Sequence, residues 1–217
     1  MVEFLKEAAH VVPSKRQLDW FEMERYAFVH YGVNTYTDRE WGEGTEDEKI
    51  FNPTALDCDQ WVEAVKSAGL KGLILTAKHH DGFCLFDSQY TDFKSTNTPY
   101  GRDIVKEFVE AVRAEGLKVG LYFTLLDWYH DDYPHYGDKN HPMRNNPAYS
   151  NEKRDFSRYV EYMHNQVREI CTNYGKLDIL WFDFSYENEN YVMRGETWGA
   201  TELVNMVREL QPGIIID

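Results

Sequence analysis

Hydrophobic and polar residues follow two periods along this chain. Short apolar runs, typical of buried strands, are separated by segments in which apolar residues recur every three or four positions, as on one face of a helix. The predicted strands cover residues 26–33, 73–78, 118–124, 177–184 and 214–217. The predicted helices cover residues 14–25, 57–68, 103–115, 153–174 and 201–210. Strands and helices therefore alternate along the chain.

This alternation favours an α/β fold. Continuous apolar strands joined by amphipathic helices are typical of a parallel sheet covered on both sides. The first strand-to-helix turns lack the glycine-rich fingerprint of dinucleotide-binding folds, so a (β/α)8 barrel fits better. Such a barrel has eight strands, and five are predicted here. We therefore expect residues 1–217 to form one domain, a (β/α)8-like (TIM) barrel truncated after about five strands.

Local signals mark the helix ends and one long loop. Ser14 and Gln17 have the spacing of a capping box, and Asp57 and Asp103 stand at N-cap positions. The loop 125–152 is longer than most loops in compact domains, which is typical of functional or mobile segments. Its tryptophan is expected to anchor the loop and its histidines to be solvated; these residues are Trp128, His130, His135 and His141.

The active site of a (β/α)8 barrel lies at the carboxyl ends of its strands. Polar residues gather at these ends in the predicted fold. They are His30 near the end of the first strand, His79 and His80 after the second, Asp127 and Trp128 after the third, and Asp183 at the end of the fourth. These separate segments should therefore meet at one mouth.

The paired histidines depend on where the second strand ends. Alternation along a strand places Thr76, Lys78 and His80 on one face and His79 on the other. Both imidazoles can reach one site only if the strand ends near Lys78 and the chain then turns. Asp81-Gly82 provides that turn signal. The alternative is that both histidines are simply solvated loop residues.

Alternation in the fourth strand places Trp181 and Asp183 on one face. A carboxylate on a buried strand is unfavourable unless it is hydrogen-bonded, so Asp183 either caps the next loop or acts as a nucleophile or general base. Aspartate, histidine and tryptophan without a serine or cysteine nucleophile motif suit retaining glycoside hydrolysis. That reaction needs one ionised carboxylate and a second, protonated one about 5 Å away.

The three histidines at the strand ends, together with Asp183, could instead hold a divalent ion in a metal-dependent barrel hydrolase. Lys78 adjoins the histidine pair, and neither an H-x-H nor an H-E-x-x-H spacing is present. We therefore expect no metal and no cofactor. Cys58, Cys84 and Cys171 are far apart and show no disulfide or metal-binding spacing.

Composition restricts the partners. The formal net charge is −14, which disfavours nucleic acid and anionic membrane surfaces. Six Trp, fifteen Tyr and twelve Phe provide rings that suit the CH faces of sugars as well as a core. No stretch reaches transmembrane length, and the start lacks a signal-peptide pattern. We expect a cytoplasmic protein and leave open a removed leader, for a secreted or periplasmic location, and a homo-oligomer.

Several motifs together resemble a known family. In chain order they are Phe28-Val29-His30-Tyr31-Gly32, Glu40-Trp41, the run from Thr76 to Phe83, Arg102-Asp103, Gly120-Leu121-Tyr122 and Leu180-Trp181-Phe182-Asp183. Within the third piece, Lys78-His79-His80-Asp81-Gly82-Phe83 is specific, and the other pieces add weight by their order. From about Gln17 to Asp217 the chain resembles the catalytic domain of glycoside hydrolase family 29, the α-L-fucosidases.

The resemblance implies a catalytic (β/α)8-like barrel followed by a β-sandwich, and retaining removal of terminal α-L-fucose from fucosylated oligosaccharides or glycoconjugates. It implies that Asp183 is the nucleophile that forms the fucosyl-enzyme intermediate. The residues implied to bind fucose are His30, Glu40, Trp41, His79, His80, Tyr122 and Trp181. The acid/base carboxylate and a sugar-binding arginine are implied to follow Asp217, so the isolated 217 residues should be inactive.

The chain departs from the family pattern at two positions. Phe184 follows the nucleophile where the family often has glycine, which should reshape the leaving-group side. Tyr31 stands where the family has tryptophan. Glu40 is the candidate for the acid within this chain. A catalytically inactive fucose-binding protein remains the alternative to an enzyme.

Overall fold

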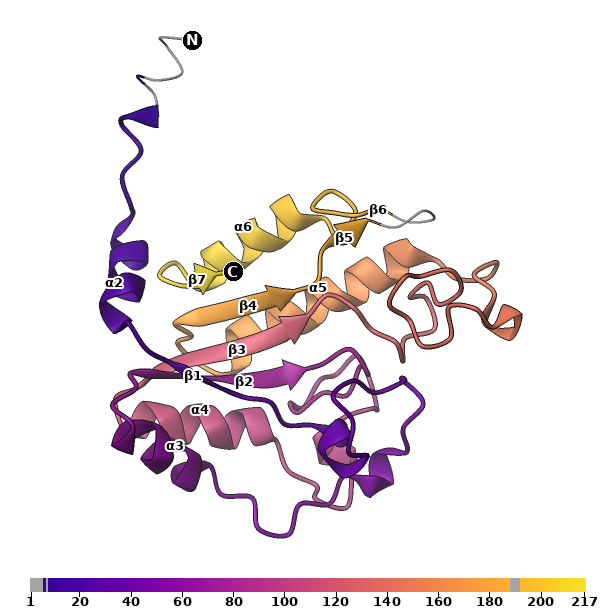
Figure 1. The fold of residues 1–217 in the computed structure, drawn as a ribbon, viewed down its shortest axis with the longest axis horizontal. Coiled ribbons are helices and arrows are strands. Elements are labelled where there is room, and N and C mark those ends of the chain that lie inside the picture. The colour runs from indigo at the N-terminus through magenta and orange to yellow at the C-terminus, as the bar shows by residue number, and fades with distance from the viewer. Residues whose placement is uncertain (1–5, 7, 188–191) are drawn as a thin grey trace.

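Five parallel strands form the central sheet of this structure, a computed structural model that describes residue 6 and residues 8–187 and 192–217. The strands are β1 (Ala27–Val29), β2 (Gly72–Lys78), β3 (Lys118–Thr124), β4 (Ile179–Asp183) and β7 (Ile215–Ile216). They lie in chain order, and each pairs in parallel with the next. The sheet does not close on itself within the described ranges (Figure 1). This confirms the predicted α/β fold, with an unclosed parallel sheet whose strands lie in the chain order of a (β/α)8 barrel.

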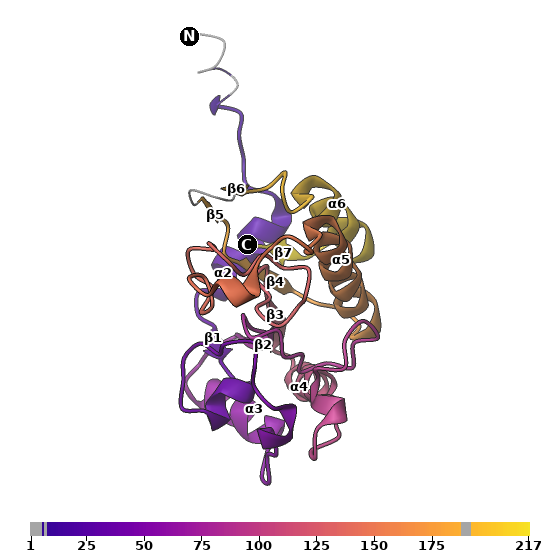
Figure 2. The ribbon, with the colours of Figure 1, turned by 90° about the vertical axis from the view of Figure 1, so that its right-hand side faces the viewer.

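Four helices connect the strands and cover one face of the sheet. They are α3 (Cys58–Ser67), α4 (Ile104–Ala114), α5 (Phe156–Asn173) and α6 (Ala200–Leu210). Figure 2 shows them in an arc around the strands. The main core lies between these helices and the sheet, where Leu73, Leu75 and Leu121 are fully buried.

Sequence analysis expected helices on both faces of the sheet, but the opposite face is largely free of helices in the described structure. Helix α2 (Lys15–Met23) reaches only part of it, where Met23 joins Ile74, Tyr122 and Ile179 in a second, smaller cluster. The inner face of a barrel is packed by strand side chains rather than by helices, which explains the difference. The inner face therefore leads directly to the carboxyl ends of the strands.

The capping predictions are confirmed. Asp57 accepts a hydrogen bond from the backbone of Gln60 at 3.1 Å, and Asp103 accepts one from Lys106 at 2.9 Å. Two boundaries were wrong. Strand β1 ends at Val29 because the chain then leaves the sheet for a short 3-10 helix at Val33–Tyr36. Helix α5 begins at Phe156 rather than at 153, after an N-cap at Asp155.

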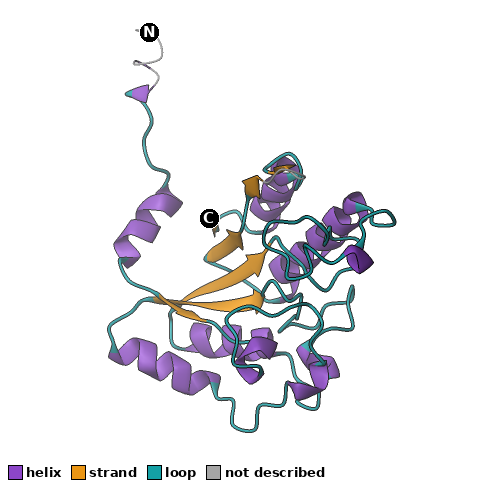
Figure 3. Cartoon of the chain, turned by 45° about the vertical axis from the view of Figure 1, so that its right-hand side comes forward, coloured by secondary structure: helices purple, strands orange, loops and turns teal. Residues whose placement is uncertain are grey.

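The connections at the carboxyl ends of the strands are long and mostly irregular (Figure 3). The connection between β4 and α6 contains two short antiparallel strands, β5 (Tyr186–Glu187) and β6 (Val192–Met193), which the sequence analysis did not predict. Residues 188–191 lie outside the described residues. Among the described helices, none is long and apolar enough to cross a membrane. The sheet thus presents its carboxyl ends to these loops, and the candidate site lies there.

Candidate active site

Asp183 is the last residue of β4 and is held by two hydrogen bonds. The hydroxyl of Tyr122 donates to its Oδ2 at 2.5 Å, and the backbone N–H of Phe184 donates to its Oδ1 at 2.9 Å. Trp181, two residues earlier on the strand, packs edge-on against Phe28 with ring centroids 5.0 Å apart. The carboxylate is therefore hydrogen-bonded, as burial on a strand requires.

The two adjacent histidines reach the same site. Strand β2 ends at Lys78, and the N–H of Gly82 donates to the carbonyl of His79 at 2.9 Å, which closes the predicted turn. The rings of His79 and His80 lie 4.1 Å apart, and the ring of His30 lies 4.5 Å from that of His79. His79 is 8% exposed and His80 is fully buried. The alternative of solvated loop histidines is therefore wrong.

These three imidazoles are held neutral. Burial lowers the pKa of His79 to about 2 and that of His80 to about 3. Burial also lowers the pKa of His30, although the nearby charge of Glu40 acts in the opposite direction. A neutral imidazole donates from one nitrogen and accepts at the other, which suits a hydroxyl partner.

Two ring nitrogens in this group have no hydrogen-bond partner among the described residues: Nδ1 of His79 and Nε2 of His80. The other nitrogen of His80, Nδ1, lies 2.7 Å from the hydroxyl oxygen of Thr124. Buried polar atoms are nearly always satisfied, so unpartnered ones point to a water or a ligand. Nδ1 of His79 and Nε2 of His80 are therefore the nitrogens through which this arrangement can bind a hydroxyl group.

Tyr122 joins the two halves of the site. Tyr122 pairs with Trp181 in the β3–β4 ladder, so its side chain lies on the same face of the sheet as that of Asp183. The ring of Tyr122 stacks on that of His79, with centroids 5.7 Å apart and planes 24° apart. The structure therefore places Tyr122 beside both Asp183 and His79.

Trp41 reaches the site from the loop 34–56. Its ring meets His80, Trp128 and Phe184 edge-on or nearly so, at 5.5, 6.0 and 6.0 Å. Its side chain is 41% exposed, so it forms an edge of the mouth rather than its floor. Glu40 is exposed beside it and acts on the site through its charge.

The loop 125–152 corrects one expectation and confirms another. His135 and His141 were expected to be solvated, but they are 5% and 0% exposed, and His130 is half-buried. The loop folds back on itself, which stacks His135 on His141 at 4.1 Å and covers both. Trp128 is 2% exposed and packs on His80 and His141, so it does anchor the loop.

Lys78 was expected on the same face as Thr76 and His80, and this was wrong. In the β2–β3 ladder Thr76 pairs with Tyr122 and Lys78 pairs with Phe123, so Ala77 is an extra, bulged residue. The bulge turns Lys78 to the helix-covered face. A bulge depends on pairing between distant strands, so it leaves no signal in the local pattern.

Sequence analysis also missed a residue with unusual backbone geometry. Phe184 has a positive φ of 64°, which glycine adopts readily and other residues rarely adopt. Its ring lies edge-on to His80 at 4.8 Å, so the side chain forms part of the site. The departure from glycine noted in the sequence was the one available signal.

The described residues contain no group of three or more His, Cys, Asp or Glu side chains arranged to hold a metal ion. Both oxygens of Asp183 already accept hydrogen bonds, and Nδ1 of His80 is paired with the hydroxyl of Thr124. The donor set therefore does not fit the metal-site alternative. The three cysteines are buried free thiols.

Comparison with known proteins assigns the chain to a family. The alpha-L-fucosidase family matches residues 8–217. Alpha-L-fucosidase 1 of Arabidopsis thaliana is 35% identical over 94% of this chain, which spans 37% of that relative's length. The structure of alpha-L-fucosidase isoenzyme 1 from Paenibacillus thiaminolyticus matches with a TM-score of 0.86 and 51% identity, over 94% of this chain and 50% of that one. An alpha-L-fucosidase GH29 from Bacteroides thetaiotaomicron matches with a TM-score of 0.77 and 29% identity, over 94% and 48%. This chain belongs to the α-L-fucosidase family.

Proposed function

We propose that this chain carries the nucleophile and most of the fucose-binding side chains of a retaining α-L-fucosidase that removes terminal α-L-fucose from fucosylated glycans. The observation that carries the proposal is Asp183, held at a strand end by Tyr122 and facing a group of neutral histidines. A crystal structure of a bacterial fucosidase with an iminocyclitol inhibitor matches this chain with a TM-score of 0.77 and 29% identity.

In the first step, Asp183 attacks the anomeric carbon and the bond to the leaving oxygen breaks. The hydrogen bond from Tyr122 fixes one carboxylate oxygen and the N–H of Phe184 fixes the other, so the group enters the reaction already oriented. Water then hydrolyses the fucosyl-enzyme ester. Two displacements at the same carbon retain its configuration.

Fucose binding falls to the surrounding rings. His30, His79 and His80 are neutral, so each of their ring nitrogens can donate to or accept from a sugar hydroxyl. His80 offers only Nε2, because its Nδ1 is already paired with the hydroxyl of Thr124. Trp41 and Trp181 offer apolar faces at the outer edge and the inner wall. Glu40 would accept a hydrogen bond from a sugar hydroxyl at the edge of the mouth, beside Trp41.

The reaction also needs a proton donor about 5 Å from the nucleophile. Glu40 is exposed on the loop 34–56 rather than enclosed in the site, so we do not assign it this role. We therefore assign the acid/base role to a carboxylate that follows Asp217, as the family resemblance implies. The nucleophile and its donor would then come from different parts of the full-length protein.

The test uses the full-length protein with the substitution Asp183→Gly. Turnover of an aryl α-L-fucoside should be lost, and added azide should restore it by forming a β-L-fucosyl azide, since azide takes the place of the carboxylate. Asp178→Asn, just before the other end of β4, is the matched control and should keep turnover. A folded Asp183→Gly protein that azide does not rescue would exclude Asp183 as the nucleophile.

Two readouts of the same assay address the alternatives. Activity that a chelator removes would support a metal-dependent hydrolase. Fucose binding by a full-length protein that hydrolyses no fucoside would support the inactive binding protein.

A further inference from the structure

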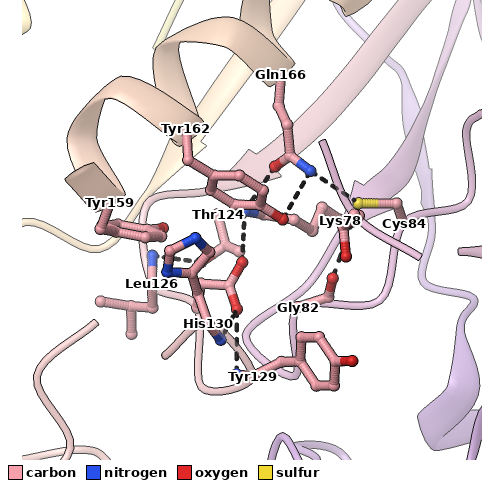
Figure 4. Close-up of polar contacts among 12 residues, drawn as sticks. Lys78, Gly82, Cys84, Thr124, Leu126, Tyr129, His130, Tyr159, Tyr162 and Gln166 are labelled. Atoms are coloured by element: carbon pink, nitrogen blue, oxygen red, sulfur yellow. Dashed lines mark hydrogen bonds and ion pairs between the residues drawn. The ribbon is translucent and has the colours of Figure 1, made fainter. Parts of the chain in front are cut away.

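Lys78 is a fully buried lysine directly beneath the paired histidines. Its Nζ lies 3.0 Å from Oδ2 of Asp127 and 3.1 Å from Oε1 of Gln166. Figure 4 shows Gln166 and Tyr162, both from α5, reaching toward it. The Nζ also lies 4.5 Å from the centroid of the Phe123 ring. Lys78, Asp127 and Gln166 are each 0% exposed.

A buried ion pair of this kind is weak evidence for stability. Removing two charges from water is so unfavourable that apolar residues of similar volume are often as stable or more stable. The space around Lys78 is lined by aromatic rings that would accept such a residue. The pair therefore calls for an explanation other than stability.

Asp127 uses its second oxygen to hold the loop that follows β3. Its Oδ1 accepts hydrogen bonds from the backbone of Tyr129 at 3.1 Å and of His130 at 2.9 Å. The same oxygen lies against Gly82, where an added Cβ would approach it to 2.4 Å. Asp127 thus fills the gap between the loops after β2 and β3.

The residues on either side of Asp127 hold His80. The N–H of Trp128 donates to the carbonyl of His80 at 2.8 Å. The hydroxyl oxygen of Thr124 lies 2.7 Å from Nδ1 of His80 and accepts from the backbone of Leu126 at 3.1 Å. One short segment, residues 124–128, therefore fixes both the backbone and the ring of His80.

We propose that the Lys78–Asp127 pair is a positioning device for the fucose-binding histidines: it locks the segment 124–128 onto the end of β2, so that Nε2 of His80 faces the mouth. This inference rests on the proposed function of His80. Lys78 touches no substrate in this proposal and acts only through Asp127 and that segment.

The test compares the full-length wild-type protein with Lys78→Met/Asp127→Asn. Asn keeps an oxygen acceptor for the two backbone amides, and Met fills the volume of the lysine stem. We expect the double variant to fold, and kcat/KM for an aryl α-L-fucoside to fall about tenfold. In a His80→Ala background the same two substitutions should change kcat/KM less than about twofold, because their effect passes through His80.

A purely structural pair would give another pattern. A folded double variant with wild-type kcat/KM, or an undiminished loss in the His80→Ala background, would overturn the proposal. If the double variant does not fold, Lys78→Met alone carries the same cycle, because Asp127 keeps its hydrogen bonds from the backbone of Tyr129 and His130. The imidazole NMR signals of His80 in ligand-free protein give a readout independent of turnover: they should shift in the variants, and unchanged signals would also overturn the proposal. A wild-type protein inactive on all fucosides would instead count against the proposed function.

Discussion

The hydroxyl of Tyr122 lies 2.5 Å from Oδ2 of Asp183, while the ring of the same tyrosine stacks on His79. One side chain therefore contacts both the proposed nucleophile and a proposed fucose-binding residue. Any displacement of Tyr122 on β3 would disturb both contacts together. The relative placement of nucleophile and sugar pocket thus depends on the pairing of β3 with both β2 and β4.

Removing this hydroxyl tests the contact with the carboxylate. Tyr122→Phe keeps the ring and its stacking but leaves Oδ2 of Asp183 without its donor. Hydrogen bonds to charged groups are worth about 1.5–3 kcal/mol, so kcat/KM of the full-length enzyme should fall about 10- to 100-fold. Tyr174→Phe is the matched control because Tyr174 donates to Asp103 at 2.7 Å away from the site. Equal kcat/KM in Tyr122→Phe and wild type would show that the bond does not orient the nucleophile.

The loop that carries Trp41 depends on a glycine. Gly44 has a φ of 74°, and an added Cβ would lie 2.2 Å from the carbonyl oxygen of Trp128. Gly44→Ala should push the loop off Trp128, displace Trp41 and raise KM, with a loss of about 1–3 kcal/mol in unfolding free energy.

Gly116→Ala is the control that separates the clash of an added Cβ with Trp128 from the strain of a positive φ. Gly116 has a similar φ of 70°, but an added Cβ would meet no atom within 4 Å. This control should lose stability without a change in KM. If Gly44→Ala left KM unchanged as well, the packing of the Trp41 loop on Trp128 would not matter for substrate binding.

Elements set by neighbouring residues could be predicted from the sequence. Asp57 and Asp103 mark helix starts because an N-cap bonds only to the next few residues. The strand-end rule found Asp183 and His80 because a barrel brings the carboxyl ends of its strands together. These predictions needed only periodicity and topology.

Features set by distant pairing could not be predicted. The bulge at Ala77 turns Lys78 to the helix side, and it exists only because β2 and β3 pair in one register. The burial of His141 follows from the way the loop 125–152 folds on itself. Asp127 was noted at a strand end, yet its partner Lys78 was expected on another face, so their contact could not be inferred.

The backbone of Phe184 allows a direct test of strain near the nucleophile. A left-handed conformation is unfavourable for residues other than glycine by about 1–2 kcal/mol. Phe184→Gly and Phe184→Ala both remove the ring that contacts His80, but only alanine keeps the strain. Glycine also loses more conformational entropy on folding than alanine, which lowers the stability of the glycine variant by about 0.5–1 kcal/mol. The glycine variant should therefore be as stable as the alanine variant or up to about 1.5 kcal/mol more stable, and chemical unfolding measures the difference. A clearly more stable alanine variant would contradict the left-handed conformation.

The buried histidines should make stability fall in acid. Burial lowers the pKa of His141 to about 3, and its Nδ1 accepts a hydrogen bond from the backbone of Met143 at 2.9 Å. In the unfolded chain a histidine titrates near 6.5, so between these two values the unfolded state holds more protons and stability decreases as pH falls. At pH 5.5 this one residue should reduce the free energy of unfolding by about 1.4 kcal/mol.

His141→Asn isolates that contribution, since the asparagine oxygen can replace Nδ1 as acceptor for Met143. Between pH 7.5 and 5.5 the variant should lose about 1.4 kcal/mol less than wild type in chemical unfolding, whereas the control His10→Asn, at an exposed position, should match wild type. Asp81 acts in the opposite sense, because burial raises its pKa to about 7 and its native carboxyl takes up a proton as pH falls. That gain is present in wild type and variant alike, so it cancels in the comparison. Parallel pH profiles for wild type and His141→Asn would mean that His141 is protonated in the native state.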